Sequence, residues 1–176
     1  MARADVAARE VLDKAGIAKP PVDPFLIAQE LLGVLLVKTE MKDDVSGMLV
    51  REPTRTVIGI NQSHAPNRQR FTVAHEIGHL QLHKGRPLIM DTDVRVNLRD
   101  SVSGMATDRE EIEANRFAAA LLIPEPMVRN EISTLNFASA EDLVMKLQAR
   151  FKVSPSAMNF RLVNLGILPN PVDLSS

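Results

Sequence analysis

The chain has 176 residues, of which 45% are apolar and 24% charged, and it contains no cysteine, tryptophan or tyrosine. This length and balance suit one globular domain of ordinary size. A net charge of −1 argues against general electrostatic binding to nucleic acid, and the absence of cysteine excludes disulfides, thiolate metal sites and thiol nucleophiles. Any metal must therefore be bound by His, Asp or Glu.

The N-terminal part of the chain predicts two helices. Residues 2–15 form an amphipathic pattern that Gly16 ends. A second helix is expected over residues 24–32, because Asp23 can cap it and Pro24 suits the first helical position.

The chain start lacks the apolar run of a signal peptide, and no window approaches ~18 uninterrupted apolar residues. We therefore expect a cytoplasmic protein without a membrane segment.

Three short segments then predict strands. Residues 34–37 are aliphatic and suit a buried strand, and residues 46–51 and 56–61 flank a turn at residues 52–55. Together they predict a mostly antiparallel sheet of about three strands. We expect residues 56–61 to lie at a sheet edge, where an extended substrate could add as a further strand.

The most informative segment is a helix expected from about residue 66 to residue 83. It contains the sequence His75-Glu76-Ile77-Gly78-His79. Residues four apart on a helix differ by only about 40° in rotation, so both imidazoles can reach one metal ion while the glutamate faces its open side. This spacing is typical of metal-dependent peptidases. A chance match anywhere in a chain of this composition has a probability of roughly half a per cent.

The segment after this helix has a mixed character. Residues 94–99 suit another strand, and residues 101–107 are expected to form a mobile loop. A further helix is expected over about residues 108–123, where Pro124 stops it.

This further helix is the expected source of a third metal ligand, because a catalytic zinc site usually has three protein ligands. It offers Glu111 and Glu113, which helical rotation separates by about 200°, so only one of them can face the metal. We favour Glu111, because Asn115 lies one turn further on the same face and could accept the spare N–H of a ligating histidine. Glu113 stays open as the alternative ligand or as a structural or partner-binding carboxylate.

The C-terminal part predicts helices over residues 126–132, 139–150 and 154–165. Residues 143–165 have the helix–turn–helix appearance of a DNA reader, with a slight excess of basic residues that includes Arg161. The favoured alternative is that these helices close the core or grip a protein substrate. The last six residues are expected to be loose.

Two segments resemble the ImmA/IrrE family of metallopeptidases. They are residues 70–79, which hold the histidine motif, and residues 111–124, which hold Glu111 and Asn115. The similarity extends from about residue 24 to residue 126. It implies that His75, His79 and Glu111 bind zinc and that Glu76 is the catalytic base. It also implies cleavage of a helix-turn-helix repressor, which would release stress, phage or mobile-element genes from repression.

The expected fold class is therefore α+β. A zincin-like metallopeptidase domain over residues 1–126 would place a small, mostly antiparallel sheet beside the histidine helix. A C-terminal helical region over residues 127–170 would pack on the same domain. Zinc is the expected cofactor, and manganese is the alternative.

The group that stabilises the oxyanion is left open, because no tyrosine is present. The candidates beside the metal itself are His64, His83 and Arg99. We read His83 as a helix-end or cleft-lining residue, because a continuous helix cannot bring three histidines to one ion.

The sequence leaves two rival functions open. One is a non-catalytic regulator that keeps the metallopeptidase scaffold and binds a repressor or DNA without cutting. The other is a general peptidase of unfolded chains.

Overall fold

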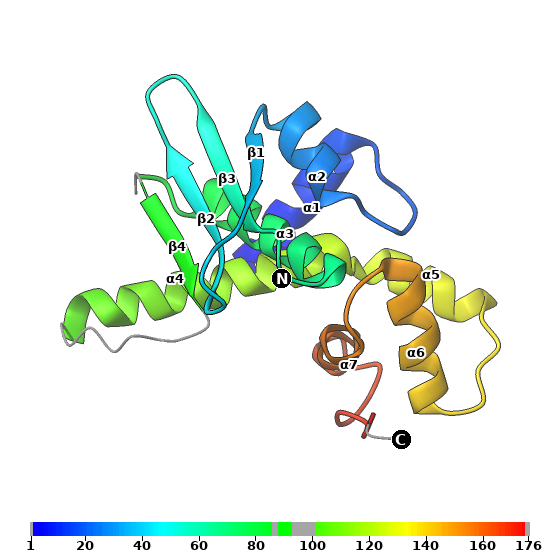
Figure 1. Cartoon of the computed structure of the whole chain (residues 1–176). Coiled ribbons are helices and arrows are strands. Elements are labelled where there is room, and N and C mark those ends of the chain that lie inside the picture. Colours follow the sequence, from blue (N-terminus) through cyan, green and yellow to red (C-terminus); the bar gives the residue numbers. More distant parts are fainter. Residues whose placement is uncertain (1, 86–87, 93–100, 175–176) are drawn as a thin grey trace.

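The computed structural model describes residues 2–85, 88–92 and 101–174 of the chain. It confirms an α+β fold, in which the helices lie to one side of a small sheet (Figure 1). The elements in chain order are α1 (Arg3–Ala15), α2 (Pro24–Leu26), the π-helical turn η1 (Ile27–Leu31), β1 (Leu35–Thr39), β2 (Val45–Arg51), β3 (Thr56–Asn61), α3 (Pro66–Leu82), β4 (Leu88–Thr92), α4 (Ser101–Leu122), α5 (Glu125–Thr134), α6 (Ala140–Phe151) and α7 (Pro155–Asn164).

The sheet has four strands in the order β1-β3-β2-β4. Strand β2 pairs antiparallel with β3 and β4, whereas β1 pairs parallel with β3. The prediction of a mostly antiparallel sheet is confirmed, and the described residues add a fourth strand, β4, to the three predicted over residues 34–61. Strand β4 was not predicted, because its apolar run covers only residues 88–90, which is too short to indicate a strand.

Two predictions about the strands are wrong. The segment predicted as a buried strand is the exposed edge strand β1, in which Leu35 and Val37 are 48% and 41% exposed. Residues 56–61, predicted to lie at an edge, form β3 between β1 and β2. A short aliphatic run does not reveal its neighbours in the sheet, so its place there depends on the tertiary fold.

The N-terminal helices agree with their predicted signals. Gly16 ends α1 in the left-handed conformation, with φ of 66°. The Asp23 side chain accepts hydrogen bonds from the backbone N–H groups of Phe25 and Leu26, and so caps α2 as expected. The helix then widens into the π-turn η1 before Gly33.

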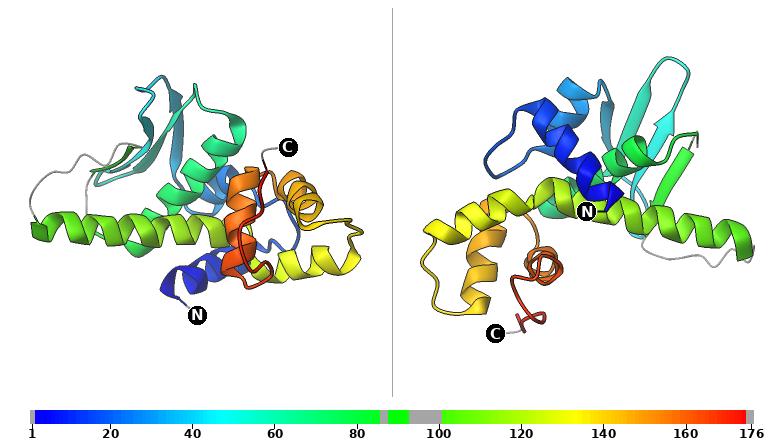
Figure 2. Two further views of the ribbon diagram at one scale, coloured as in Figure 1. Left: turned by 90° about the horizontal axis from the view of Figure 1, so that it is seen from below. Right: turned by 180° about the vertical axis from the view of Figure 1, so that it is seen from behind.

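Helix α3 packs against β2 and β3 on one side and against α4 on another (Figures 1 and 2). Val73, Ala74 and Ile77 are completely buried in it. The crossing with α4 is close at Gly78, where an added Cβ would lie 3.1 Å from Ala114 Cα and 3.2 Å from Phe117 Cβ. A side chain at position 78 would therefore force the two helices apart.

Replacing Gly78 by alanine should destabilise the protein by up to about 2 kcal/mol once the gain in helix propensity is subtracted from the clash. Alanine gains up to about 1 kcal/mol of helix propensity, but the overpacking costs about 1–3 kcal/mol. The clash wins because the neighbouring atoms belong to, or adjoin, the α4 backbone and cannot rotate away. Urea unfolding measures the difference, and a midpoint that stays the same or rises would contradict the close crossing.

Helix α4 begins at Ser101, so the prediction of a loop over residues 101–107 is wrong. Ser, Thr and Gly are weak helix formers, but extending an existing helix needs no new nucleus, so the strong helix from residue 108 onward propagates into them. The strand predicted over residues 94–99 lies outside the described residues.

Helices α5, α6 and α7 lie at the C-terminal end of α4, away from the sheet (Figure 2). The side chains of Ser139 and Ser154 cap α6 and α7, at the predicted starts of these two helices. Buried residues of α6 and α7 belong to the same hydrophobic cluster as those of α1, α3 and α4. The division of the chain into a metallopeptidase domain over residues 1–126 and a C-terminal helical region over residues 127–170 remains a prediction.

The expectation that the last six residues are loose is wrong at Val172, whose backbone N–H and C=O both pair with the Asn159 side chain.

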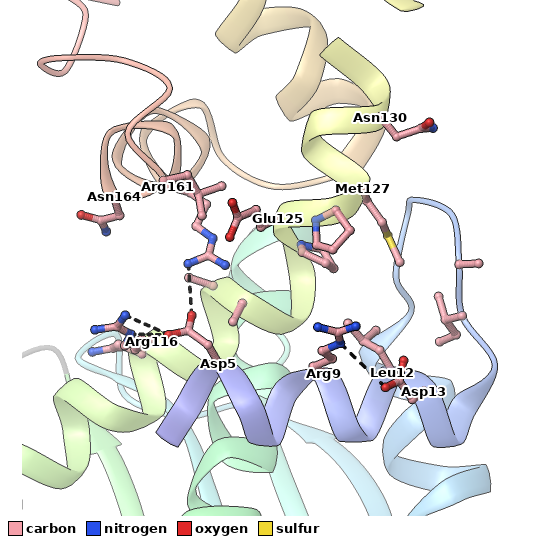
Figure 3. A pocket seen from close by; sticks show the side chains of 18 of the residues that line it. Asp5, Arg9, Leu12, Asp13, Arg116, Glu125, Met127, Asn130, Arg161 and Asn164 are labelled. Carbon is pink, nitrogen blue, oxygen red and sulfur yellow. Dashed lines mark hydrogen bonds and ion pairs between the residues drawn. The ribbon is translucent and has the colours of Figure 1, made fainter. Parts of the chain in front are cut away.

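A cavity of about 1190 Å³ lies among α1, α4, α5 and α7 (Figure 3). Arg161 of α7 lines it but is only 6% exposed, and its Nε donates to the backbone oxygen of Ile123. Asp5 of α1 lies between Arg161 and Arg116 and forms ion pairs with both. Burial lowers the pKa of Arg161, although Asp5 raises it. Arg161 therefore joins α7 to the body of the protein and is not available to read DNA.

Replacing Arg161 by alanine should lower the free energy of unfolding by about 1–3 kcal/mol, because a buried carbonyl loses its donor. Arg9 lines the same cavity but is exposed, and its ion pair with Asp13 is long at 4.0 Å. Arg9→Ala is thus a matched control with an expected change within about 0.5 kcal/mol. Equal urea midpoints for the two variants would contradict this role of Arg161.

Candidate metal centre

Three side chains from two helices converge at the crossing of α3 and α4. The Nε2 atoms of His75 and His79 lie 2.9 Å apart. His75 Nε2 lies 3.2 Å from Oε2 of Glu111 on α4, and His79 Nε2 lies 3.2 Å from Oε1 of the same side chain. Among the described residues, these three form a group whose donor atoms all lie within 4.8 Å of one another. The structure thus brings together the three side chains that the sequence predicted as ligands.

The two histidines are 2% and 1% exposed, whereas the Glu111 side chain is 28% exposed. Burial alone would raise the pKa of Glu111, but its hydrogen bonds and charge interactions with His75 and His79 lower this pKa well below its ordinary value. Glu111 is therefore an ionised carboxylate near neutral pH. An ionised carboxylate beside two imidazoles is a donor set that suits a divalent metal ion.

Asn115 fixes the orientation of the first histidine. Its Oδ1 lies 3.0 Å from His75 Nδ1, one helical turn beyond Glu111 as the sequence predicted. An amide oxygen can only accept, so Nδ1 of His75 carries a proton, and Nε2 is the nitrogen that a metal ion can bind in place of a proton shared with Glu111. This tautomer is the one that can bind a metal through Nε2.

The separations of the donor atoms also fit a metal ion. Atoms bound to zinc at about 2.0–2.2 Å in a tetrahedral arrangement lie about 3.3–3.6 Å apart. The separations of 2.9, 3.2 and 3.2 Å, of which the last two reach different oxygens of Glu111, are a few tenths of an ångström shorter. Two imidazoles and one carboxylate leave a fourth position for water or substrate, as catalytic sites require.

A comparison with known families assigns the chain. The model of the IrrE N-terminal-like domain, a peptidase family, matches residues 29–163, which is more than half of the chain. The chain belongs to the ImmA/IrrE family of metallopeptidases. Family membership and the cluster of His75, His79 and Glu111 together indicate a metal cofactor.

Two radiation response metalloproteases named IrrE are similar to this ImmA/IrrE-family chain. The protein of Deinococcus radiodurans is 33% identical over 119 residues, which are 67% of this chain and 34% of the relative. The protein of Deinococcus deserti is 29% identical over 163 residues, which are 92% of this chain and 54% of the relative. The chain therefore spans between about a third and about half of the length of these relatives.

A solved structure of a Mycobacterium tuberculosis transcriptional regulator shares the fold of this family member. The match covers 91% of this chain and 46% of the regulator, with a TM-score of 0.60 and 18% sequence identity. At this identity, the likeness concerns the fold alone.

The predicted base of the family motif, Glu76, is completely buried in α3. Strand β2 approaches it at Gly47, where an added Cβ would lie 3.4 Å from Glu76 Oε1. Glycine at this position therefore leaves space beside the carboxylate.

Arg51 of β2 supports the end of the helix that carries the site. Its Nη2 donates to the backbone oxygens of His79 and His83 at 2.9 and 2.8 Å. These carbonyls lie at the C-terminal end of α3, where a cation is favourable. Burial lowers the pKa of Arg51, and the negative charge of Glu76 raises it. Sequence reasoning missed this residue, because its role depends on contacts between segments far apart in the chain.

The three candidates for the oxyanion lie as follows. His83 contacts His79 through Nδ1 and Glu113 through Nε2. His64 lies near the backbone oxygen of Asp43. Arg99 lies outside the described residues. A role for any of them at the oxyanion remains a prediction.

No helix in the described part of the chain combines the length and apolar character that crossing a membrane requires.

Proposed function

We propose that this protein is a zinc-dependent endopeptidase that cleaves a helix-turn-helix repressor in the cytoplasm. The observation that carries the proposal is the convergence of His75, His79 and Glu111 beside the buried Glu76. The similarity to two radiation response metalloproteases supports a proteolytic activity. In this proposal the cleavage releases stress, phage or mobile-element genes from repression.

His75, His79 and Glu111 would hold the zinc. When bound, zinc supplies a Lewis acid that polarises the scissile carbonyl and lowers the pKa of a coordinated water toward ~7. Asn115 would hold the proton of His75 on Nδ1, through its hydrogen bond to that atom, and so leave Nε2 for the metal.

Glu76 would move the protons of the reaction. As a carboxylate it accepts a proton from the attacking water and then passes this proton to the nitrogen of the leaving amine. Its complete burial restricts competing contact with solvent.

The substrate would bind in an extended conformation along an exposed sheet edge, where its backbone can pair with a strand. Because β3 lies inside the sheet, the edge must be β1 or β4. We favour β4, because it pairs with β2, the strand whose Gly47 approaches Glu76. An extended segment of the repressor would then lie close to the three proposed ligands.

Incubation with purified repressors tests the proposal. Zinc-loaded protein is mixed with candidate helix-turn-helix repressors, the first being any that its own gene neighbourhood encodes, and the products are analysed by intact mass spectrometry. Two fragments whose masses add up to the repressor plus one water are expected. Cleavage of unfolded casein but of no repressor would instead favour a general peptidase.

A further inference from the structure

His83, the third histidine of the series, lies where it can orient His79. It follows the last residue of α3, with backbone angles of −118° and 81°, so it has left the helical conformation. Its side chain is nevertheless buried, with the residue only 7% exposed. The rings of His79 and His83 have centroids 5.0 Å apart and planes tilted by 57°.

The nitrogen atoms of this pair define a chain of hydrogen bonds. Nδ1 of His83 lies 3.0 Å from Nδ1 of His79. On the other side of its ring, Nε2 of His83 lies 3.2 Å from Glu113 Oε2. The series therefore runs from Glu113 through His83 to His79. The other ring nitrogen of His79, Nε2, lies 3.2 Å from Glu111 Oε1.

The protons in this series can be assigned from chemistry alone. The Glu113 carboxylate can only accept, so Nε2 of a neutral His83 carries the proton. Its Nδ1 is then an acceptor and takes the N–H of His79 Nδ1, which leaves the lone pair of His79 on Nε2. That is the tautomer required for binding a metal at this site.

Cations hold the far end of the series in place. Arg109 Nε lies 3.3 Å from Glu113 Oε1, and Arg3 Nη1 lies 3.8 Å from Glu113 Oε2. The backbone oxygen of His83 is held in turn by Arg51.

We infer that His83 is a positioning residue that fixes the tautomer and ring orientation of His79 for metal binding, and that Glu113 orients His83. This inference rests on the proposed metal site. It assigns His83 the role at His79 that Asn115 has at His75. It also accounts for Glu113, which the sequence offered as the alternative ligand. Glu113 is an acceptor that two hydrogen bonds separate from the proposed ligand His79.

The test measures zinc affinity by competition with a chelator of known affinity, independently of peptidase activity. His83→Leu keeps most of the volume but removes the acceptor, and it should weaken zinc binding by about 10–100-fold. His83→Asn places an amide oxygen at the branch position of Nδ1, so it should recover most of the affinity. Glu113→Leu should weaken binding in the same direction but less than His83→Leu.

Absorption of the cobalt-substituted protein gives a second readout. His83→Leu should change the visible spectrum of bound cobalt, because His79 can rotate, and His83→Asn should restore it. Asn159→Leu is the matched control, since Asn159 is also buried and makes two hydrogen bonds but lies in α7. This control should match the wild type in both measurements.

The outcomes separate two failures. A wild-type protein that binds no metal would overturn both the proposed function and this inference. Wild-type protein that binds zinc, together with a His83→Leu variant of unchanged affinity and cobalt spectrum, would overturn the inference alone. A His83→Asn variant as weak as His83→Leu would show that volume, and not the acceptor, matters, and would overturn it as well. If His83→Leu does not fold, the comparison of His83→Asn and Glu113→Leu with the wild type decides.

Discussion

Glu76→Gln is expected to slow repressor cleavage by at least about a hundredfold while the protein retains its metal. Glutamine has nearly the same size as glutamate, so it should fit the completely buried position. Its amide, however, cannot take a proton from water or pass one to the leaving amine. The loss should therefore appear in kcat, with zinc content unchanged when both are measured on the same preparation.

Glu141→Gln is a suitable control for the same substitution at the exposed first turn of α6. Its activity should equal that of the wild type. Cleavage by Glu76→Gln at the wild-type rate would contradict the role of Glu76. A Glu76→Gln variant that no longer cuts the repressor but still inactivates it would favour the non-catalytic regulator.

Glu111→Gln, unlike Glu76→Gln, should strongly weaken metal binding. The ionised oxygens of Glu111 lie 3.2 Å from both histidine Nε2 atoms, and a neutral amide is a much poorer ligand. Loss of a group that only orients a ligand already weakens binding by about 10–100-fold. Loss of a ligand itself should therefore weaken zinc binding by more than about a hundredfold, as measured by chelator competition.

Glu113→Gln is the matched control on the same helix. Its amide oxygen still accepts the hydrogen bond from His83, so its zinc affinity should stay close to that of the wild type. The opposite ranking would contradict this assignment. If Glu113→Gln lost the metal and Glu111→Gln kept it, the third ligand would be Glu113.

Much of this site could be predicted from the sequence, because it depends on local helical geometry. The spacing of His75 and His79 fixes their common face whatever the rest of the fold. The phase of Glu111 and Asn115 is likewise fixed once α4 is helical, and the structure brings both to the histidines. These relations need no knowledge of long-range contacts.

The parts that were missed depend on contacts between distant segments. The parallel pairing of β1 with β3 and the presence of β4 cannot be read from the hydrophobic pattern of each strand. The role of Arg51 needs β2 to lie against the end of α3.

His83 is an intermediate case. Its spacing of four from His79 already predicts that the two side chains share a helix face, and Nδ1 of His83 does lie 3.0 Å from Nδ1 of His79. The contact of its Nε2 with Glu113 depends on the packing of α3 against α4. The sequence therefore indicated the neighbour of His83 on its own helix but not its neighbour on α4.

The most direct test of the central claim is a crystal structure of the zinc-loaded protein with anomalous diffraction data collected at the zinc absorption edge. A single strong peak is predicted within about 2.0–2.2 Å of His75 Nε2, His79 Nε2 and a carboxylate oxygen of Glu111. Density that lacks a peak among these three side chains, or a peak coordinated by Glu113 in place of Glu111, would contradict it.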